Sequence, residues 1–379
     1  MLWIDEQRPK TLRQLNFHEA LTARLQRLAN DGEIPHLLVH GPPGAGKATR
    51  ISCLLRAMYG VGAERKRLDR REFKTPSGQT VELSMVSSAY HIEMCPSDAG
   101  NYDRYVIQDI IKEVASHTSL HSTGLGGKEN VDRDGDAMDL EDDAKKSSSK
   151  PPFKVVLLME VDRLSRQAQA ALRRTMEKYS SSCRLILCGS SLSKVIEPVR
   201  SRCLKLRVPL PQHEQVCDVL AAICRKKRLD LPPEFARSLS EHSNRNLRRA
   251  ILLLEAAYVQ SYPFSRDQAV TPLDWEAHIA ILAKELSREQ TPAKLLRARQ
   301  MLYELLTNCI PGDVILDKLT QELLKNLDAQ LKPEITRWAA FYAHRIAMGS
   351  KEIFHLEAFV AKYMAVYKKY INDMFGGDF

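Results

Sequence analysis

The chain contains the sequence Leu37-Leu38-Val39-His40-Gly41-Pro42-Pro43-Gly44-Ala45-Gly46-Lys47-Ala48-Thr49, in which a short apolar run precedes a Gly-rich loop. The apolar run predicts a buried β-strand, and apolar residues then recur at helical spacing from Ala48 to Tyr59. A strand, a loop of the form G-x-x-x-x-G-K and a helix are typical of a phosphate-binding loop, whose backbone N–H groups surround nucleotide phosphates. We expect Lys47 to contact the β- and γ-phosphates, assisted by the partial positive charge of the helix N-terminus.

The loop departs from the usual pattern at its end. Ala48 stands where Ser or Thr would supply a hydroxyl ligand for Mg²⁺. A second departure follows the apolar run that ends at Leu158, where a nucleotidase has an Asp for the Mg²⁺ shell and then a Glu that polarises water. Here the first position is Met159, whose thioether cannot replace a carboxylate on a hard cation, and the second is Glu160.

The loss of two metal-shell positions predicts a site that binds ATP or ADP as a structural group and hydrolyses it slowly or not at all. Mg²⁺ is expected to be weakly held or absent, and no metal-ligand set is predicted. Glu160 is then a residual, inactive catalytic acid, and Asp162 is interpreted as a turn or helix-start acid. The alternative is an active ATPase in which Glu160 and Asp162 suffice with an unconventional Mg²⁺ shell. A scaffold that binds no nucleotide is disfavoured by the intact glycines and Lys47.

Composition narrows the class of protein. A chain of 379 residues accommodates two or three domains, and its net charge of +9 favours a polyanionic partner such as nucleic acid, although mild basicity is also common in soluble proteins. The eight cysteines contain no C-x-x-C pair, which argues against a zinc module or a disulfide framework. The N-terminus lacks an apolar signal core and no long uncharged apolar run follows, so we expect a cytosolic or nuclear protein without a membrane partner.

Further strands are predicted at residues 154–159 and 184–188, and strands alternating with helices favour an α/β fold with a parallel sheet. Residues 122–150 contain eight acidic and five basic residues and no aromatic residue, which predicts a disordered acidic insertion. After Pro209 the pattern is helical. The final helix is predicted to place one apolar stripe against a core or an oligomer partner: Leu356, Phe359, Val360, Tyr363, Tyr367, Tyr370 and Ile371.

Several segments occur in an order that is specific for one family. They are Leu2-Trp3-Ile4-Asp5-Glu6-Gln7-Arg8-Pro9, Pro35-His36-Leu37-Leu38, the phosphate loop, Ala171-Leu172-Arg173-Arg174-Thr175-Met176-Glu177, Ser201-Arg202-Cys203 and the tail around His355-Leu356-Glu357-Ala358-Phe359-Val360-Ala361-Lys362. Together they resemble a small subunit of eukaryotic replication factor C, the AAA+ sliding-clamp loader. The similarity is greatest to the small subunit with a degenerate ATPase centre, at one end of the pentameric arc.

The resemblance implies three domains: a RecA-like AAA+ P-loop domain at 1–208, a small helical lid at 209–261 and an all-α collar domain for oligomerisation at 270–379. It also implies a nuclear subunit of a heteropentamer that opens the sliding clamp PCNA and loads it onto primer–template DNA in replication and repair. The acidic insertion at 122–150 departs from the family pattern.

The resemblance also assigns residues. Arg202 is the arginine finger that acts in trans on the adjacent subunit's ATP site, in keeping with the ability of a guanidinium to stabilise a transferring phosphoryl group. Ser190 lies near the first sensor position, where the family usually has Asn. The residues implied in nucleotide binding are Arg8 and Pro9 on the adenine side, Gly41, Pro42, Pro43, Gly44, Ala45, Gly46, Lys47, Ala48 and Thr49 in the loop, and Arg248 at the second sensor position.

For DNA, the candidates are Arg104, Lys112 and Arg173, on two helices expected to face the inside of the subunit spiral. Phosphate contacts there would give sequence-independent, salt-sensitive binding, as loading at any sequence requires. Each of these residues is equally well explained as a solvated charge on a helix surface.

Overall fold

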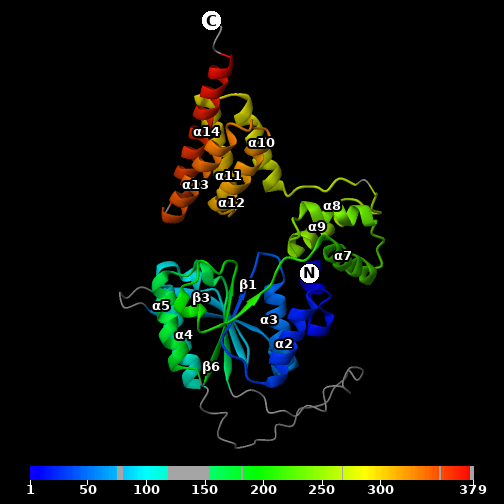
Figure 1. Cartoon of the computed structure of the whole chain (residues 1–379), viewed down its shortest axis with the longest axis vertical. Helices are drawn as coiled ribbons and strands as arrows, with labels where there is room; N and C mark the ends of the chain where they lie inside the picture. The colour runs from blue at the N-terminus through cyan, green and yellow to red at the C-terminus, as the bar shows by residue number, and fades with distance from the viewer. Residues whose placement is uncertain (75–79, 118–152, 181, 267, 350, 376–379) are drawn as a thin grey trace, which may run out of the picture. The chain divides into compact units, whose positions relative to one another are not determined.

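The computed structural model describes residues 1–74, 80–117, 153–180, 182–266, 268–349 and 351–375. The predicted acidic insertion, 122–150, lies outside these residues. The chain forms two compact units, Met1–Val270 and Thr271–Phe379, and each is described by itself (Figure 1). Among the described residues, no helix has the length and apolar character needed to cross a membrane.

The first unit is built on a seven-stranded sheet with the order β2-β3-β4-β5-β6-β1-β7. Its strands are β1 (Leu37–His40), β2 (Arg67–Lys74), β3 (Thr80–Ser87), β4 (His91–Met94), β5 (Lys154–Leu158), β6 (Cys183–Gly189) and β7 (Leu204–Arg207). The five neighbouring strands β4, β5, β6, β1 and β7 pair in parallel, as predicted. The remaining pairings are antiparallel, so the sheet is mixed, with the hairpin of β2 and β3 added to its parallel part.

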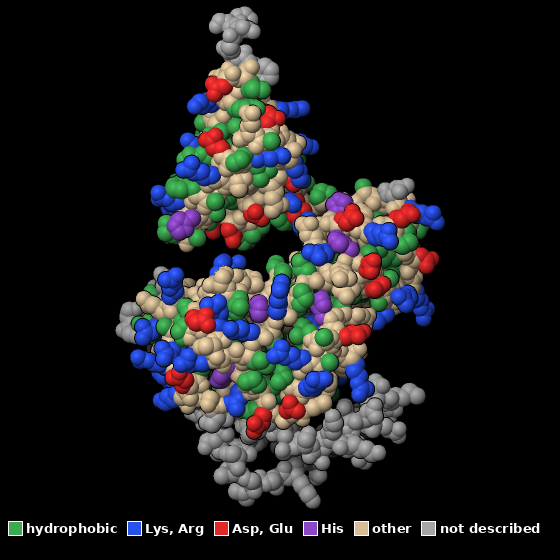
Figure 2. All heavy atoms as spheres, viewed as in Figure 1, with side chains coloured by type: hydrophobic (Ala, Val, Ile, Leu, Met, Phe, Trp, Pro, Cys, Tyr) green, Lys and Arg blue, Asp and Glu red, His purple; other side chains and the backbone are tan. Residues whose placement is uncertain are grey.

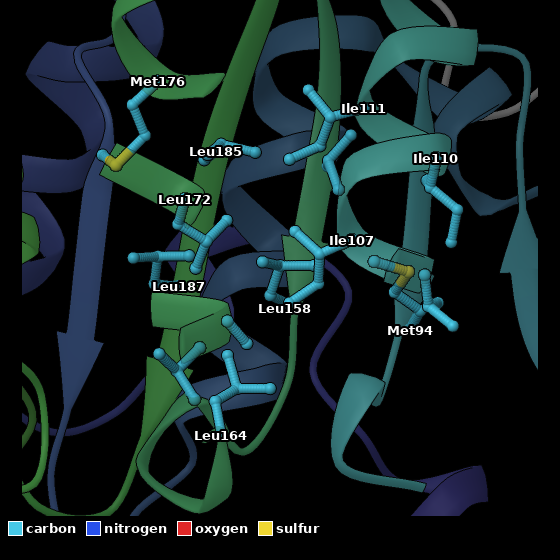
Figure 3. Close-up of a cluster of buried hydrophobic side chains, with 14 of the residues drawn as sticks. Met94, Ile107, Ile110, Ile111, Leu158, Leu164, Leu172, Met176, Leu185 and Leu187 are labelled. Carbon is cyan, nitrogen blue, oxygen red and sulfur yellow. The ribbon is translucent and has the colours of Figure 1, made fainter. Parts of the chain in front are cut away.

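Helices cover both faces of this sheet, because successive strand residues point to opposite sides. Val155 and Leu157 of β5 belong to the core formed with α2 (Glu19–Asp31) and α3 (Lys47–Tyr59). Val156 and Leu158 belong to the core on the other face, under α4 (Asp103–His117) and α5 (Arg166–Lys178). Figure 3 shows this second core, where side chains of α4 and α5 meet those of β5 and β6. Both faces of the sheet are therefore buried under helices.

The same unit includes a small helical lid. It consists of α7 (His213–Lys227), α8 (Pro233–His242) and α9 (Leu247–Gln260) around a core of its own. Trp3, in the short helix α1 (Trp3–Glu6), is buried in that core, and its backbone N–H donates to Glu255 Oε2 at 3.1 Å. The N-terminus of the chain is thus packed against the lid helix α9 (Figure 1).

The second unit consists of α10 (Asp274–Arg288), α11 (Pro292–Thr307), α12 (Gly312–Lys325), α13 (Lys332–Met348) and α14 (Glu352–Phe375). Its core includes four residues of the predicted stripe on the last helix, Leu356, Phe359, Val360 and Tyr363, which are buried. The predicted fold class is therefore confirmed: an α/β sheet domain, a helical lid and an all-α C-terminal region. The remaining short elements are η1 (Leu12–Gln14), η2 (Val61–Glu64), η3 (Pro96–Tyr102), η5 (Val161–Arg163) and α6 (Glu197–Arg200).

Candidate functional site

The Gly-rich loop lies at the carboxyl end of β1 and leads into α3, as the sequence predicts. Gly44 and Gly46 have φ of +75° and +84°, in the left-handed region that favours glycine. A Cβ added at Gly41 would lie 2.0 Å from the Val208 carbonyl oxygen, so this position also requires glycine. The first turn of α3 has no side-chain cap, which leaves its N-terminal end suited to an anion.

Lys47 is folded back over the loop. Its Nζ donates to the carbonyl oxygens of Gly41 at 2.6 Å and Pro42 at 2.9 Å. Burial lowers the pKa of Lys47, the nearby Asp162 carboxylate opposes this change, and the Arg248 guanidinium adds to it. The structure therefore brings both Asp162 and Arg248 within electrostatic range of the loop lysine.

Two segments outside the sheet complete the surroundings of the loop. Arg8 Nε donates to Thr49 Oγ1 at 3.2 Å, which places the N-terminal segment beside the first turn of α3. From the lid, the Asn246 side chain caps α9 by accepting from Arg249 N–H at 3.2 Å. A Cβ added at Gly44 would lie 1.8 Å from Asn246 Oδ1, so the lid cap is packed on the loop itself.

The acidic positions after β5 are already paired. Glu160 has a left-handed backbone, with φ of 52°, and its carboxylate lies 3.3 Å from Arg163 Nη1. Asp162 accepts hydrogen bonds from the backbone N–H of Ser190, at 3.1 Å, and from its hydroxyl. Burial raises the pKa of Asp162, but these hydrogen bonds outweigh it and hold the pKa below its usual value. Met159 packs against the hydrophobic core beneath the loop.

Asp162 therefore has a more definite role than that of a turn acid, because it joins η5 to the residue that follows β6. The sequence contains no spacing that would reveal this pair, since 28 positions separate Asp162 from Ser190. The contact between Asn246 and Gly44 was also missed. Its signal is the N-cap residue type before an apolar helix, which predicts a helix start but not what packs on it.

Arg202 follows α6, and its guanidinium is bonded to neighbouring helices of the same chain. Arg202 Nε donates to Glu177 Oε1 at 2.8 Å, and Nη1 donates to the Pro198 carbonyl oxygen at 2.8 Å. Glu177 lies in the last turn of α5. The side chain of Arg202 retains 29% exposure, so part of the guanidinium faces solvent.

The three DNA candidates lie on α4 and α5, which pack side by side on one face of the sheet. Arg104, Lys112 and Arg173 are exposed. Asp103 joins the two helices at their N-terminal ends, where it is buried and accepts from the Ser165 N–H at 2.8 Å and hydroxyl at 2.9 Å. Lys and Arg side chains are spread over the visible face of this unit, as Figure 2 shows.

Comparisons with known protein families agree with this organisation. Residues 17–212 match the family model described as DNA polymerase III, delta subunit. Residues 218–259 match the RCF1/5-like AAA+ ATPase lid domain. Residues 275–371 match the C-terminal domain of replication factor C subunit 3. The sheet domain, the lid and the C-terminal helices thus each match a family model, and the model over the C-terminal helices is named for replication factor C subunit 3.

Curated relatives extend this similarity over nearly the whole chain. Replication factor C subunit 3 of Bos taurus is 50% identical over 372 residues, which cover 98% of each chain. Replication factor C subunit 3 of Arabidopsis thaliana is 46% identical and covers 99% of this chain and 100% of its own. Replication factor C subunit 5 of Schizosaccharomyces pombe is 44% identical, with 97% of each chain covered.

Proposed function

Because this chain belongs to the replication factor C family, as a small subunit of the clamp loader, we propose that it holds ATP or ADP structurally and hydrolyses it weakly or not at all. In the same proposal, it supplies Arg202 to the ATP site of the adjacent subunit. Membership of this family places the chain in a multi-subunit clamp-loader complex.

The loop fits a nucleotide. Gly44 and Gly46 have the backbone that lets successive N–H groups converge, and a Cβ at Gly41 would collide with Val208. The uncapped start of α3 and the ammonium of Lys47 both favour phosphate at this place. Arg8 and Arg248 flank the loop from the N-terminal segment and the lid, which supports the assignment of all three segments to one nucleotide.

The observation that most supports weak hydrolysis is that the residues after β5 already contact other parts of the chain. Met159 contributes to the core, and the Asp162 carboxylate is occupied by Ser190. Glu160 is paired with Arg163, and Ala48 offers no hydroxyl. This arrangement leaves the loop able to bind phosphate but poorly equipped to order Mg²⁺ and a nucleophilic water.

The wider proposal concerns the partners. We propose that the subunit acts in the nucleus, within a heteropentamer that opens PCNA and loads it onto primer–template DNA. Exposed Arg104, Lys112 and Arg173 on adjacent helices support a contact with the DNA backbone, because phosphate contacts give binding without sequence preference.

The nucleotide proposal is tested on the full chain by titration with a fluorescent ATP analogue, with and without Mg²⁺, alongside a turnover assay. We expect the wild-type chain to bind the analogue without hydrolysing ATP, and we expect Lys47→Ala to lose this binding. Lys66→Ala removes a lysine that pairs with Glu93 on the surface, and should bind as the wild type does. Mg²⁺-dependent turnover that Glu160→Gln abolishes would overturn the proposal in favour of an active ATPase with an unconventional Mg²⁺ shell.

The proposal for Arg202 is tested in the assembled complex. Arg202→Ala should lower hydrolysis at the adjacent subunit's site while leaving nucleotide binding by this chain unchanged. The measurement uses a complex in which every phosphate loop except that of the adjacent subunit carries a Lys→Ala substitution. Unchanged hydrolysis in this complex would contradict the role in trans.

A further inference from the structure

The guanidinium of Arg202 is held by one carboxylate. Glu177 Oε1 accepts from Arg202 Nε at 2.8 Å and from Nη2 at 2.5 Å, so the guanidinium presents one of its long edges to Glu177. Nη1 donates to the Pro198 carbonyl oxygen at 2.8 Å, with a longer 3.5 Å contact to Ser201 Oγ. Because hydrogen bonds hold the Nε–Nη2 edge and Nη1 at the same time, the guanidinium is restricted in its rotation about the last bonds of the side chain.

This arrangement keeps donors available. A guanidinium has five N–H groups, two of them on Nη2. Glu177 accepts from one of the two N–H groups on Nη2, and among the described residues none accepts from the other. An arginine held along one edge can therefore still offer its outer end to phosphoryl oxygens of another subunit.

Glu177 is itself located by its helix. It lies in α5, where Arg173 Nε one turn earlier is 3.9 Å from the same oxygen, Oε1. Thr175 and Met176 beside it are buried, so the backbone that carries Glu177 is fixed against the sheet. The carboxylate thus stands on a rigid helix, whereas Arg202 follows only the four-residue helix α6.

We propose that Glu177 is a positioning residue for Arg202: it holds the guanidinium in the orientation in which Arg202 reaches the adjacent subunit's nucleotide. This inference rests on the proposed role of Arg202 in trans. The Glu177 side chain is 54% exposed and that of Arg202 is 29% exposed, and ion pairs with this access to solvent contribute little to folding stability. Loss of Glu177 should therefore change catalysis without unfolding the subunit.

The test is a double-mutant cycle in the assembled complex, with the other phosphate loops inactivated by Lys→Ala. Glu177→Ala should lower kcat at the adjacent site roughly tenfold, as expected for a catalytic group that loses its orientation. KM for ATP should not change, because the adjacent subunit's own loop binds the nucleotide. Glu177→Gln, which keeps an acceptor oxygen without the charge, should retain an intermediate kcat.

The cycle separates this inference from the proposal beneath it. In the Arg202→Ala background, Glu177→Ala should have no further effect; independent, multiplying effects would overturn the positioning role. An increase in kcat on Glu177→Ala would also overturn it, since the ion pair with Glu177 would then keep Arg202 away from the adjacent subunit's nucleotide. No effect of Arg202→Ala itself would refute the role in trans and the inference with it, whereas an effect of Arg202→Ala without one of Glu177→Ala refutes the inference alone.

A matched control uses another exposed ion pair of the same unit. Glu64→Ala breaks the pair of Glu64 with Arg56, on the helix and turn behind the loop. Thermal unfolding and complex assembly should be equal for Glu64→Ala, Glu177→Ala and the wild type. Only Glu177→Ala should lower kcat.

Discussion

Asn246 of the lid lies against Gly44 of the phosphate loop, so closely that a methyl group on Gly44 would be 1.8 Å from the Asn246 side-chain oxygen. The same oxygen caps α9. The start of a lid helix and the centre of the loop are therefore one packed contact, and a nucleotide that enters the loop meets the lid at once.

Gly44→Ala should weaken nucleotide binding at least about tenfold, because the new methyl group displaces Asn246 and the lid with it. Gly32→Ala is the matched control, since Gly32 has a similar φ of +71° and nothing within 4 Å of an added Cβ. Both variants should lose about 1 kcal/mol of unfolding free energy from the left-handed backbone. Equal affinities for the fluorescent analogue in the two variants would show that the contact with Asn246 does not matter for binding.

Asp103→Ala should destabilise the first unit by roughly 3 kcal/mol, because a buried carboxylate that joins α4 to Ser165 of α5 is removed. Asp109→Ala, on the exposed side of the same helix, should change the unfolding free energy by less than about 0.5 kcal/mol. Urea unfolding of the full chain measures both. A small effect of Asp103→Ala would mean that packing alone aligns the two helices.

Stability should fall as the pH decreases through the range in which histidine titrates. His36 Nδ1 accepts from Leu185 N–H at 3.0 Å, which requires that nitrogen to be unprotonated, and burial lowers the pKa of His36. Burial also lowers the pKa of His91 to about 4. The folded state then binds fewer protons than the unfolded state below pH 6.5, so stability is present above that pH and is lost as the pH falls towards 4.

For His91 the shift from 6.5 to about 4 corresponds to roughly 3 kcal/mol at the acid end. Replacing it by Phe should therefore flatten the dependence of the unfolding free energy on pH between 6.5 and 4. His344→Phe, at an exposed position, should retain the slope of the wild type. An identical slope for His91→Phe would exclude His91 as a source of acid sensitivity.

Arg173→Ala should weaken DNA binding by the complex and reduce the slope of log affinity against log salt by about one, as expected for the loss of one phosphate contact. Arg237→Ala removes the same charge from an exposed position in the lid and should leave the slope unchanged. Titrations of labelled primer–template DNA at several salt concentrations give both slopes. Equal slopes for the two variants would contradict the assignment of Arg173.

Ala48→Thr alone should leave hydrolysis at this subunit's site at background, because Met159 still supplies no carboxylate. Ala48→Thr together with Met159→Asp should produce measurable Mg²⁺-dependent turnover. Met159→Asp should also cost about 1–2 kcal/mol of stability, since Met159 packs on the core. Turnover in Ala48→Thr alone, assayed in a complex with the other loops inactivated, would show that one restored ligand is enough.

Much of the fold could be predicted because apolar runs and loop chemistry are local. The strand at 37–40 and the helix that ends at Tyr59 agree with the structure, since the first three residues of the strand are buried and the helix follows a Gly-rich turn. The hairpin of β2 and β3 was not predicted. Its first strand is an edge strand with mostly exposed, charged residues, so it shows neither an apolar run nor a clear alternation.

Within the site, the residue types predicted the phosphate loop. The side-chain contacts made by the functional residues outside the loop could not be predicted. Asp162 meets Ser190, and Glu177 meets Arg202, only because parallel strands and their helices align distant segments. Such contacts depend on side-chain direction at the ends of elements. A single sequence does not encode that direction in any spacing between residues.

The burial of Trp3 in the lid also has a consequence for biosynthesis. Its partners Val216, Leu220 and Phe264 leave the ribosome more than 200 residues later, which at about 5–20 residues per second means tens of seconds. During that time the newly made N-terminus exposes a tryptophan that has no folded surface to join. The lid therefore completes its core only after Phe264 has been synthesised, and the first residues of the chain reach their native contacts long after they themselves are made.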